Sequence, residues 1–328
     1  MALSSPSLSV CIVNWNRREH LRQCLASAFQ SAQGLELEVI VSDNASTDGS
    51  QAMVREHFPE VRLIQNDRNL LYAAGCNVAA RSARGRHLLF LNNDAVVNER
   101  ALRRMVELLE ADPKLGICGP LLERPDGARE YSYERFPTLS WQLAKLLGLA
   151  SLAAWRLRAA LRSPAALLPV DIVLGSCLMI RGDLARCLGF FDEEFAFYYE
   201  EVDLCYRVRH AGYGVALVPD CSVTHHHAQS SGAMPEAERL CHLHGGYARF
   251  IAKHRSPRQA RLLWALFRLT LVRKLLGYAL LTVLSLGLSR KLRQKLRQAW
   301  LSLSVSRELL SGATQALARA TEHAGAGS

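Results

Sequence analysis

Four apolar runs in the first third of the chain each end in Asn or Asp residues, whose oxygen atoms bind divalent cations and accept hydrogen bonds. These residues are Asn14 and Asn16, Asp43 and Asn44, Asn66 and Asp67, and Asn92, Asn93 and Asp94. Asp43 could accept a hydrogen bond from a pyrimidine base or a ribose hydroxyl. Asp94 could hold a cation that bridges a diphosphate, because Mg²⁺ needs only one or two carboxylates. An isolated Asp in such a position is as often a helix cap or turn residue, but four polar ends in succession favour a site.

Acidic residues lie among aromatic residues in the segment "FFDEEFAFYYEEVDLC". Its carboxylates are Asp192, Glu193, Glu194, Glu200, Glu201 and Asp203. Glu200 and Asp203 share one face of the expected helix, and Glu201 is rotated away from it. A carboxylate beside aromatic surface tends to have a raised pKa, which suits a general base. The alternative is a solvated helix start, where acids are favoured by the helix dipole.

Three consecutive histidines, residues 225–227, follow another apolar run. Neutral imidazole is a common metal ligand, so one of them could share the cation of Asp94. A structural zinc site made of Cys221, His225, Cys241 and His244 is a weaker alternative, since no CxxC or HxxxH spacing anchors it.

Apolar runs of strand length alternate with segments of helical periodicity, which predicts βαβ units and a mostly parallel sheet. The expected strands cover residues 8–15, 36–43, 61–66 and 86–94, and later 170–180 and 214–220. Ser46 or Thr47 is expected to cap the helix after the second strand. Ligands of such sheets bind beyond the carboxyl ends of the strands, where the polar residues lie.

Two common nucleotide sites are excluded by the glycine pattern. The segment after the first strand reads "NWNRREHL" and lacks the G-x-G-x-x-G of a dinucleotide site. The G-x-x-x-x-G-K-[ST] signature of a P-loop does not occur either.

The basic excess of the chain lies in one segment. The 328 residues carry a formal net charge of +10, and twelve of the 40 Lys and Arg lie between Lys253 and Trp300, where there is no Asp or Glu. The other 28 basic residues are outnumbered by 30 acidic ones. Nine scattered cysteines, and a start without a signal-peptide pattern, indicate a cytoplasmic protein.

The basic segment also contains long apolar stretches. Its longest uncharged run, residues 275–289, is shorter than the roughly 20 residues that a membrane span needs. This pattern predicts amphipathic helices on the inner face of the cell membrane, bound to its anionic lipids. Whether residues 262–289 lie on the membrane or enter it stays open, as does a helical bundle packed on the rest of the protein. Long Leu runs suit lipid better than nucleic acid.

The motifs taken together resemble the inverting family 2 glycosyltransferases with the GT-A fold, and among them the rhamnosyltransferase-like group. The resemblance covers about residues 9–232. It rests on eight motifs in order: "VNWN", "VSDNASTDGS", "NDRNLLYAAGCN", "LFLNND", "RPDG", "GSCLMI", "GFFDEEFAFYYEEVDLC" and "HHHAQSS". It implies a Rossmann-like α/β fold, a mixed and mostly parallel sheet with helices on both faces, followed by amphipathic helices. The expected domains are a catalytic domain at 1–250, with a helical insertion at 138–168, and a membrane-associating tail at 251–328.

The resemblance also implies a role for each site residue. Asp43 matches the acid that binds the base, with Asn14, Asn16 and Asn77 near the donor. Asn92, Asn93 and Asp94 occupy the place of the D-x-D motif, and Asp94 and His225 match residues that hold Mg²⁺ or Mn²⁺. Glu201 matches the general base, with Glu200 and Asp203 supporting the acceptor site.

Three positions depart from the family pattern: Asn92 replaces an Asp, Glu201 replaces the usual Asp base, and Leu71 replaces a Gly near the nucleotide loop. The implied activity is transfer of a sugar, with dTDP-L-rhamnose as the donor that the subgroup suggests, to a hydroxyl of a cell-envelope saccharide or lipid-linked acceptor. The alternative is a non-catalytic nucleotide-sugar-binding or scaffold protein of the same fold.

Overall fold

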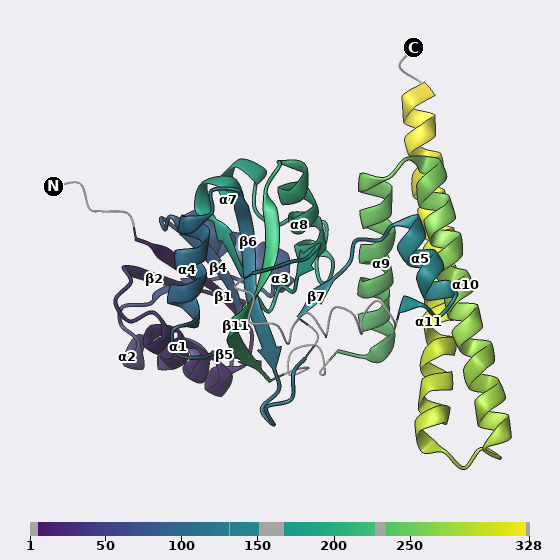
Figure 1. Cartoon of the computed structure of the whole chain (residues 1–328), viewed down its shortest axis with the longest axis horizontal. Coiled ribbons are helices and arrows are strands. Elements are labelled where there is room, and N and C mark those ends of the chain that lie inside the picture. Colours follow the sequence, from purple (N-terminus) through teal and green to yellow (C-terminus); the bar gives the residue numbers. More distant parts are fainter. Residues whose placement is uncertain (1–5, 131, 151–166, 227–233, 326–328) are drawn as a thin grey trace. The chain divides into compact units, whose positions relative to one another are not determined.

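The computed structural model of the chain describes residues 6–130, 132–150, 167–226 and 234–325 (Figure 1). The chain divides into two compact units, one made of residues 1–136 and 156–229 and the other of residues 137–155 and 230–328. The first unit thus ends before the expected boundary at residue 250. The start of the expected insertion at 138–168 groups with the C-terminal helices, and its residues 151–166 lie outside the described part of the chain.

The first unit is built on one large sheet. Its strands are β1 (Leu8–Asn14), β2 (Leu37–Asp43), β3 (Arg62–Gln65), β4 (His87–Asn92), β5 (Ala95–Val97), β6 (Leu115–Glu123), β8 (Leu168–Pro169), β10 (Cys177–Arg181) and β11 (Gly214–His225). Their order in space is β3-β2-β1-β4-β10-β6-β11-β5, with β8 also paired to β11. A separate ribbon pairs β7 (Tyr133–Glu134) with β9 (Ile172–Val173).

The sheet is mixed and mostly parallel, as predicted. Strands β3, β2, β1 and β4 run parallel, so their carboxyl ends meet at one edge. Strand β10 runs antiparallel to β4, and its first residue, Cys177, lies opposite Leu91 near the end of β4. This reversal brings the segment before β10 to the same edge as the polar strand ends.

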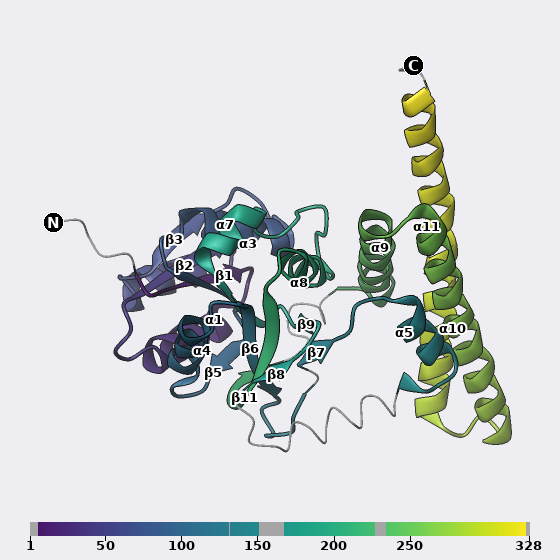
Figure 2. The same ribbon diagram turned by 45° about the horizontal axis from the view of Figure 1, so that its top comes forward.

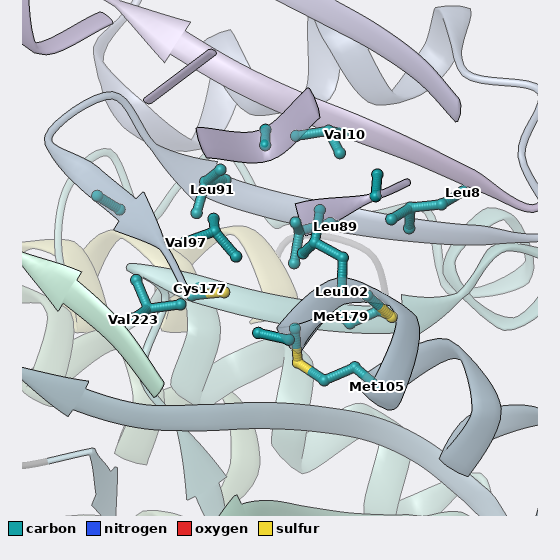
Figure 3. Packing of buried hydrophobic residues seen from close by; sticks show 14 of the residues in the cluster. Leu8, Val10, Leu89, Leu91, Val97, Leu102, Met105, Cys177, Met179 and Val223 are labelled. Carbon is teal, nitrogen blue, oxygen red and sulfur yellow. The ribbon is translucent and has the colours of Figure 1, made fainter. Parts of the chain in front are cut away.

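Helices cover both faces of this sheet (Figure 2). They are α1 (Arg18–Ser31), α2 (Ser50–His57), α3 (Leu71–Ser82), α4 (Ala101–Ala111), α7 (Gly182–Leu188) and α8 (Glu200–His210). Alternate strand residues such as Val10, Leu89 and Leu91 pack with Leu102 and Met105 of α4 in one buried layer (Figure 3). Successive side chains of a strand point to opposite faces of the sheet, and here the side chains on both faces are apolar. Each face of the sheet therefore needs a cover of helices.

Two helix starts differ from what ordinary capping would give. The cap of α2 is Gly49, which has a left-handed φ of 83°, so the expectation of a Ser46 or Thr47 cap is wrong. Ser46 instead bonds to the polar strand ends described below. Helix α3 begins at Leu71, whose φ is 63°. A left-handed residue carries steric strain unless it is Gly, which explains the usual Gly at this position.

The second unit consists of helices. These are α5 (Leu139–Leu146), α9 (Glu236–His254), α10 (Pro257–Leu284) and α11 (Arg290–Gly325). Ser256 and Gln259 form a capping box at the start of α10, with Pro257 at its first position. A short turn joins α10 to α11, and the two helices run side by side in opposite directions (Figure 1). No helix in the described residues combines the length and apolar character that crossing a bilayer requires.

Candidate active site

The ends of three parallel strands are tied together by buried polar side chains. Asn14 and Asp43 are direct partners in the pairing of β1 with β2. Asn14 Nδ2 donates to Asp43 Oδ2 at 2.9 Å, and Asn14 Oδ1 accepts from Asn93 Nδ2, just after β4, at 2.8 Å. All three residues are buried. The edge predicted from sequence is therefore a rigid, hydrogen-bonded platform.

The loop between β2 and α2 is held on this platform by Asp43. Its Oδ1 accepts from the Ser46 backbone N–H at 2.9 Å and from Gln51 Nε2 at 2.7 Å. The hydroxyl of Ser46 accepts from the Asn16 backbone N–H at 2.9 Å, and Asn16 Oδ1 accepts from the Thr47 backbone N–H at 2.7 Å. The Asp43 carboxylate is fully buried, so the nucleobase of a donor could contact it only if this loop moves.

Asp94 and His225 meet although 131 positions of sequence separate them. His225 ends β11 and pairs with Ala95 of β5, next to Asp94. Asp94 Oδ1 lies 3.2 Å from His225 Nε2, and both residues are buried. Burial opposes ionisation, but the hydrogen bond and charge of His225 outweigh it and hold the pKa of Asp94 below its usual value.

This pair fits a divalent cation. Ligand atoms about 2.1 Å from Mg²⁺ in neighbouring octahedral positions lie about 3 Å apart, close to the observed separation. Asn92 Nδ2 lies 3.4 Å from the same imidazole nitrogen, and turning this amide would present its oxygen instead. The described residues contain no group of three or more His, Cys, Asp or Glu that is arranged to hold a metal ion, so the alternative zinc set is not assembled. A magnesium-type site can take its remaining ligands from water and phosphate.

Glu130, which the sequence reading missed, lies on the far side of the His225 ring. Its Oε2 is 3.9 Å from His225 Nδ1. The "RPDG" turn positions it: the Arg124 N–H donates to the Ala128 carbonyl at 2.9 Å, and the Glu130 N–H donates to Leu122 at 2.7 Å. A carboxylate behind a ligating His orients the ring and fixes its tautomer. The only feature of the sequence that could have indicated Glu130 is that it is an acidic residue shortly after the "RPDG" turn.

Glu200 and Glu201 open helix α8 at the same edge of the sheet. The link is the segment before β10: the Ser176 carbonyl accepts from the Asn92 N–H at 3.0 Å. A Cβ added to the preceding residue, Gly175, would lie 3.5 Å from Glu201 Cβ. The sequence placed Glu201 at the site by resemblance, and the reversed strand β10 is what brings it there.

The environment of these two glutamates favours their protonated forms. Burial, with a further contribution from the negative charge of Glu134, raises the pKa of Glu201 to about 7. Burial and the charge of Glu201 raise the pKa of Glu200 well above its usual value. Oε2 of each side chain has no hydrogen-bond partner among the described residues. A carboxylate with a pKa near neutrality is suited to accept a proton at working pH.

Two other expected site residues hold the loop that precedes α8. Asn77 Nδ2 donates to the Phe191 carbonyl at 2.8 Å, and Asn77 Oδ1 accepts from the Phe191 N–H at 3.0 Å. Asp203 accepts from Arg207 Nε at 2.6 Å, and Arg207 also donates to the Phe190 carbonyl. Both amide ends of Asn77 are thus engaged by the loop, and any effect on a donor passes through that loop.

Three further side chains at this edge were not singled out from the sequence. Tyr72 donates from its hydroxyl to the Gly175 carbonyl at 2.7 Å, beside Glu201. His20 packs edge-on against His226, with ring centroids 5.6 Å apart. Trp15, between the two asparagines that follow β1, is 47% exposed. Single aromatic residues of this kind form no motif with a defined spacing. Their position at this edge could therefore be recognised only from the fold.

The sheet order, the reversed β10 and the polar strand ends define a GT-A fold of the nucleotide-sugar transferases. Residues 9–189 match the family model described as glycosyl transferase family 2. The chain therefore belongs to glycosyl transferase family 2 and is a glycosyltransferase.

Relatives and solved structures agree with this assignment. The chain is 28% identical over 279 residues to an N-acetylglucosaminyl-diphospho-decaprenol L-rhamnosyltransferase of Mycobacterium tuberculosis, covering 79% of this chain and 89% of that protein. It is similar in fold to the mannosyltransferase PcManGT from Pyrobaculum calidifontis in complex with GDP-Man and Mn²⁺, with a TM-score of 0.61, 20% identity and coverage of 93% and 87%. A GalNAc-T7 structure with UDP, GalNAc and Mn²⁺ gives a TM-score of 0.52, 17% identity and coverage of 68% and 44%.

Proposed function

We propose that this glycosyltransferase moves a hexose from a nucleoside diphosphate to a hydroxyl of a lipid-linked saccharide, with inversion at the anomeric carbon. The observation that carries the proposal is the convergence of the Asp94–His225 pair and the raised-pKa Glu201 on one edge of the sheet. A charge-neutralising group for the diphosphate and a base for the acceptor are the two functions that such a transfer requires.

Asp94 and His225 would hold Mg²⁺ or Mn²⁺, with Asn92 nearby and Glu130 orienting the imidazole ring. The cation supplies Lewis-acid neutralisation of the leaving diphosphate when it is bound. The two solved structures of similar fold contain Mn²⁺, which supports a divalent cation here.

Glu201 would accept the proton of the acceptor hydroxyl, which attacks the anomeric carbon from the face opposite the diphosphate. Its partnerless Oε2 and raised pKa support this role over that of a non-catalytic scaffold, since a purely structural carboxylate would be hydrogen-bonded or exposed. Glu200, protonated in its buried position, would stay neutral beside it.

The donor edge would be formed by the loops that follow β1 and β2. Asn14 and Asn93 would keep this edge rigid, and Asn16 and Asp43 would position the loop that faces the base. The name of the mycobacterial relative supports dTDP-L-rhamnose as donor and a diphospho-polyprenol saccharide as acceptor. The reaction would then belong to the assembly of a cell-envelope glycan.

The C-terminal helices would bring the enzyme to the inner face of the cell membrane. Most of the large apolar side chains exposed in the described residues lie on α5, α10 and the turn after α10, beside the Lys and Arg residues of the basic segment. Exposed Leu residues next to cations suit an interface with anionic lipid. Residues 1–250 and 251–328 would thus differ in function, the first catalytic and the second membrane-associating.

Transfer assays with the full-length protein test this proposal. A panel of dTDP-, UDP- and GDP-sugars is incubated with a polyprenyl-diphosphate saccharide in Mg²⁺, in Mn²⁺ and in EDTA. We expect transfer from dTDP-L-rhamnose that is lost in EDTA. Glu201→Gln should lower kcat by a factor of about 10² to 10⁴ while donor affinity changes little.

The Asp94→Asn variant separates the two roles. It should lose cation-dependent donor binding as well as transfer, because a neutral amide holds a divalent cation more weakly than a carboxylate. Near-normal turnover in Glu201→Gln would disprove the base assignment. Full activity in EDTA would disprove the cation site.

A further inference from the structure

A groove of about 500 Å³ lies between α5 and α10, wholly within the helical unit. Apart from Arg273 and Gly277, its lining side chains are aliphatic: Leu146 of α5, and Leu269, Val272, Leu276 and Leu280 of α10. The α10 residues recur at spacings of three and four, so they form one continuous face of that helix. Leu276 and Leu280 remain 64% and 61% exposed, so no part of the described chain fills this groove.

One cation, Arg273, lines the groove, and Lys145 of α5 and Lys274 of α10 adjoin it. Arg273 donates to the Lys145 carbonyl at 3.2 Å, which joins the end of α5 to α10. Desolvation, followed by the positive charges of Lys145 and Arg273, lowers the pKa of the adjacent Lys274. Neither helix contains an Asp or Glu, and none of the three cations forms an ion pair with a described residue. Like charges held together without an acid favour a bound anion.

The size of the groove favours a single hydrocarbon chain. A methylene group occupies about the volume of a water molecule, roughly 30 Å³. Because the groove is open to solvent on one side, its 500 Å³ sets an upper limit of about 17 carbons on the chain that it could hold. Gly277 leaves the floor open, since a Cβ added there would meet nothing within 4 Å. A lipid with two acyl chains would have to leave one outside.

We propose that the groove between α5 and α10 binds one single-chain lipid with a phosphate or diphosphate head, its chain along Leu269, Leu276 and Leu280 and its head at Lys145, Arg273 and Lys274. This inference rests on the proposed function, because such a lipid is the carrier part of a lipid-linked acceptor. It adds a lipid-binding site that is separate from the donor edge of the first unit.

Binding of geranylgeranyl diphosphate to the full-length protein in detergent tests the site, with neither donor nor cation present. Gly277→Leu fills the groove, and we expect it to weaken binding at least tenfold. Gly277→Ala is the matched control, since it gives the helix a better helix former but leaves most of the groove open, and it should stay within twofold of wild type. Lys145→Gln should also weaken binding at least tenfold, whereas Arg290→Gln, outside the groove, should not.

Competition identifies the ligand chemistry. Geranylgeraniol, which lacks the head, and inorganic diphosphate, which lacks the chain, should each compete at least tenfold less well than geranylgeranyl diphosphate. Equal competition by either compound, or by dioleoyl phosphatidylglycerol, would overturn the proposal, as would unchanged binding to Gly277→Leu. Donor hydrolysis by the same samples reports separately on the catalytic site, so loss of one activity is distinguishable from loss of the other.

Discussion

Single residues at the sheet edge combine properties that favour chemistry over stability, and Glu201 is the main example. Its carboxyl is desolvated and Oε2 has no partner among the described residues. A base must be ionised to act, so the pKa of about 7 predicts that kcat/KM falls as the pH drops below about 7. A pH–rate profile of the wild-type enzyme measures this limb. The residual activity of Glu201→Gln should lack it, and an unchanged limb would assign the titration to another group.

The same shift predicts a stability gain on removing the charge. The unfolded chain ionises Glu201 near pH 4.5, whereas the folded chain keeps the proton to about pH 7. Stability therefore falls as pH rises from about 4.5 to 7 and then levels off, because the folded state binds more protons in that window. Glu201→Gln should raise the free energy of unfolding at pH 8 by on the order of 1–3 kcal/mol, with little gain at pH 4. Urea unfolding at both pH values checks the sign.

Leu71 predicts a second stability difference. A non-Gly residue at a φ of 63° carries a strain of about 1–2 kcal/mol. Leu71→Gly and Leu71→Ala remove almost the same side-chain contacts, but only Gly relieves the strain. The Gly variant should therefore be about 1 kcal/mol more stable than the Ala variant, although glycine is ordinarily the poorer residue next to a helix. Equal unfolding midpoints would mean that the backbone is relaxed at this position.

The residues that could be predicted from sequence are those whose place follows from strand direction alone. Asn14 and Asp43 end parallel neighbours, so their meeting follows from the βαβ pattern. The run of three histidines suggested that one of them shares the cation of Asp94, but only the resemblance selected His225, which is 131 positions away in the sequence. Glu130 could not be anticipated, because a turn predicts a chain reversal but not which side chain then faces His225.

Elements, and not only side chains, position the base. The loop between α7 and α8 contains left-handed Phe190, Tyr198 and Tyr199, and such backbone needs strong anchors. Asn77 supplies one of them through both of its amide atoms. Asn77, which was expected to lie near the donor, thus holds the loop that leads into α8 and Glu201.

Replacing this anchor should affect stability and turnover together. Asn77→Ala leaves two buried backbone groups of Phe191 without partners, at a cost of about 1–3 kcal/mol. It should also lower kcat more than it raises KM for the donor. Arg81→Ala is the control, because it removes only an exposed ion pair to Glu193 of the same loop and should cost at most about 0.5 kcal/mol. An effect confined to donor KM would instead indicate direct contact with the donor.

The prediction of strands and helices failed where the local sequence pattern does not indicate the direction of a strand or the element with which it pairs. The expected strand at 170–180 divides into β9 and β10, and β10 runs antiparallel to β4. Strand β6, which lies between β10 and β11, was missed because its apolar run contains two glycines and a proline. Helix α5 groups with α10 through long-range contacts that no periodicity encodes.

In the whole molecule the polar edge of the sheet belongs to the first unit, whereas most of the exposed large apolar side chains of the described residues belong to the second. In the helical unit the turn after α10 leaves Leu284, Leu286 and Leu288 70–85% exposed, and Arg290 and Lys291 follow at once. Cations so close to the apolar turn favour shallow insertion at the lipid interface over a deep one. Membrane binding by this turn would be stabilised both by burial of its Leu side chains and by attraction of its cations to anionic lipid.

Vesicle flotation measures this expected attachment. Burying three Leu side chains is worth several kcal/mol, so a Leu284→Asp, Leu286→Asp, Leu288→Asp variant should bind vesicles containing phosphatidylglycerol at least 100-fold more weakly than wild type. Wild type should prefer these vesicles to pure phosphatidylcholine, and 0.5 M salt should reduce that preference because surface charges are screened. Donor hydrolysis in solution should be unaffected, whereas transfer to an acceptor embedded in vesicles should fall with binding. Equal vesicle binding by the variant and wild type would exclude this turn as the membrane contact, because three charges in hydrocarbon would be too costly to leave binding unchanged.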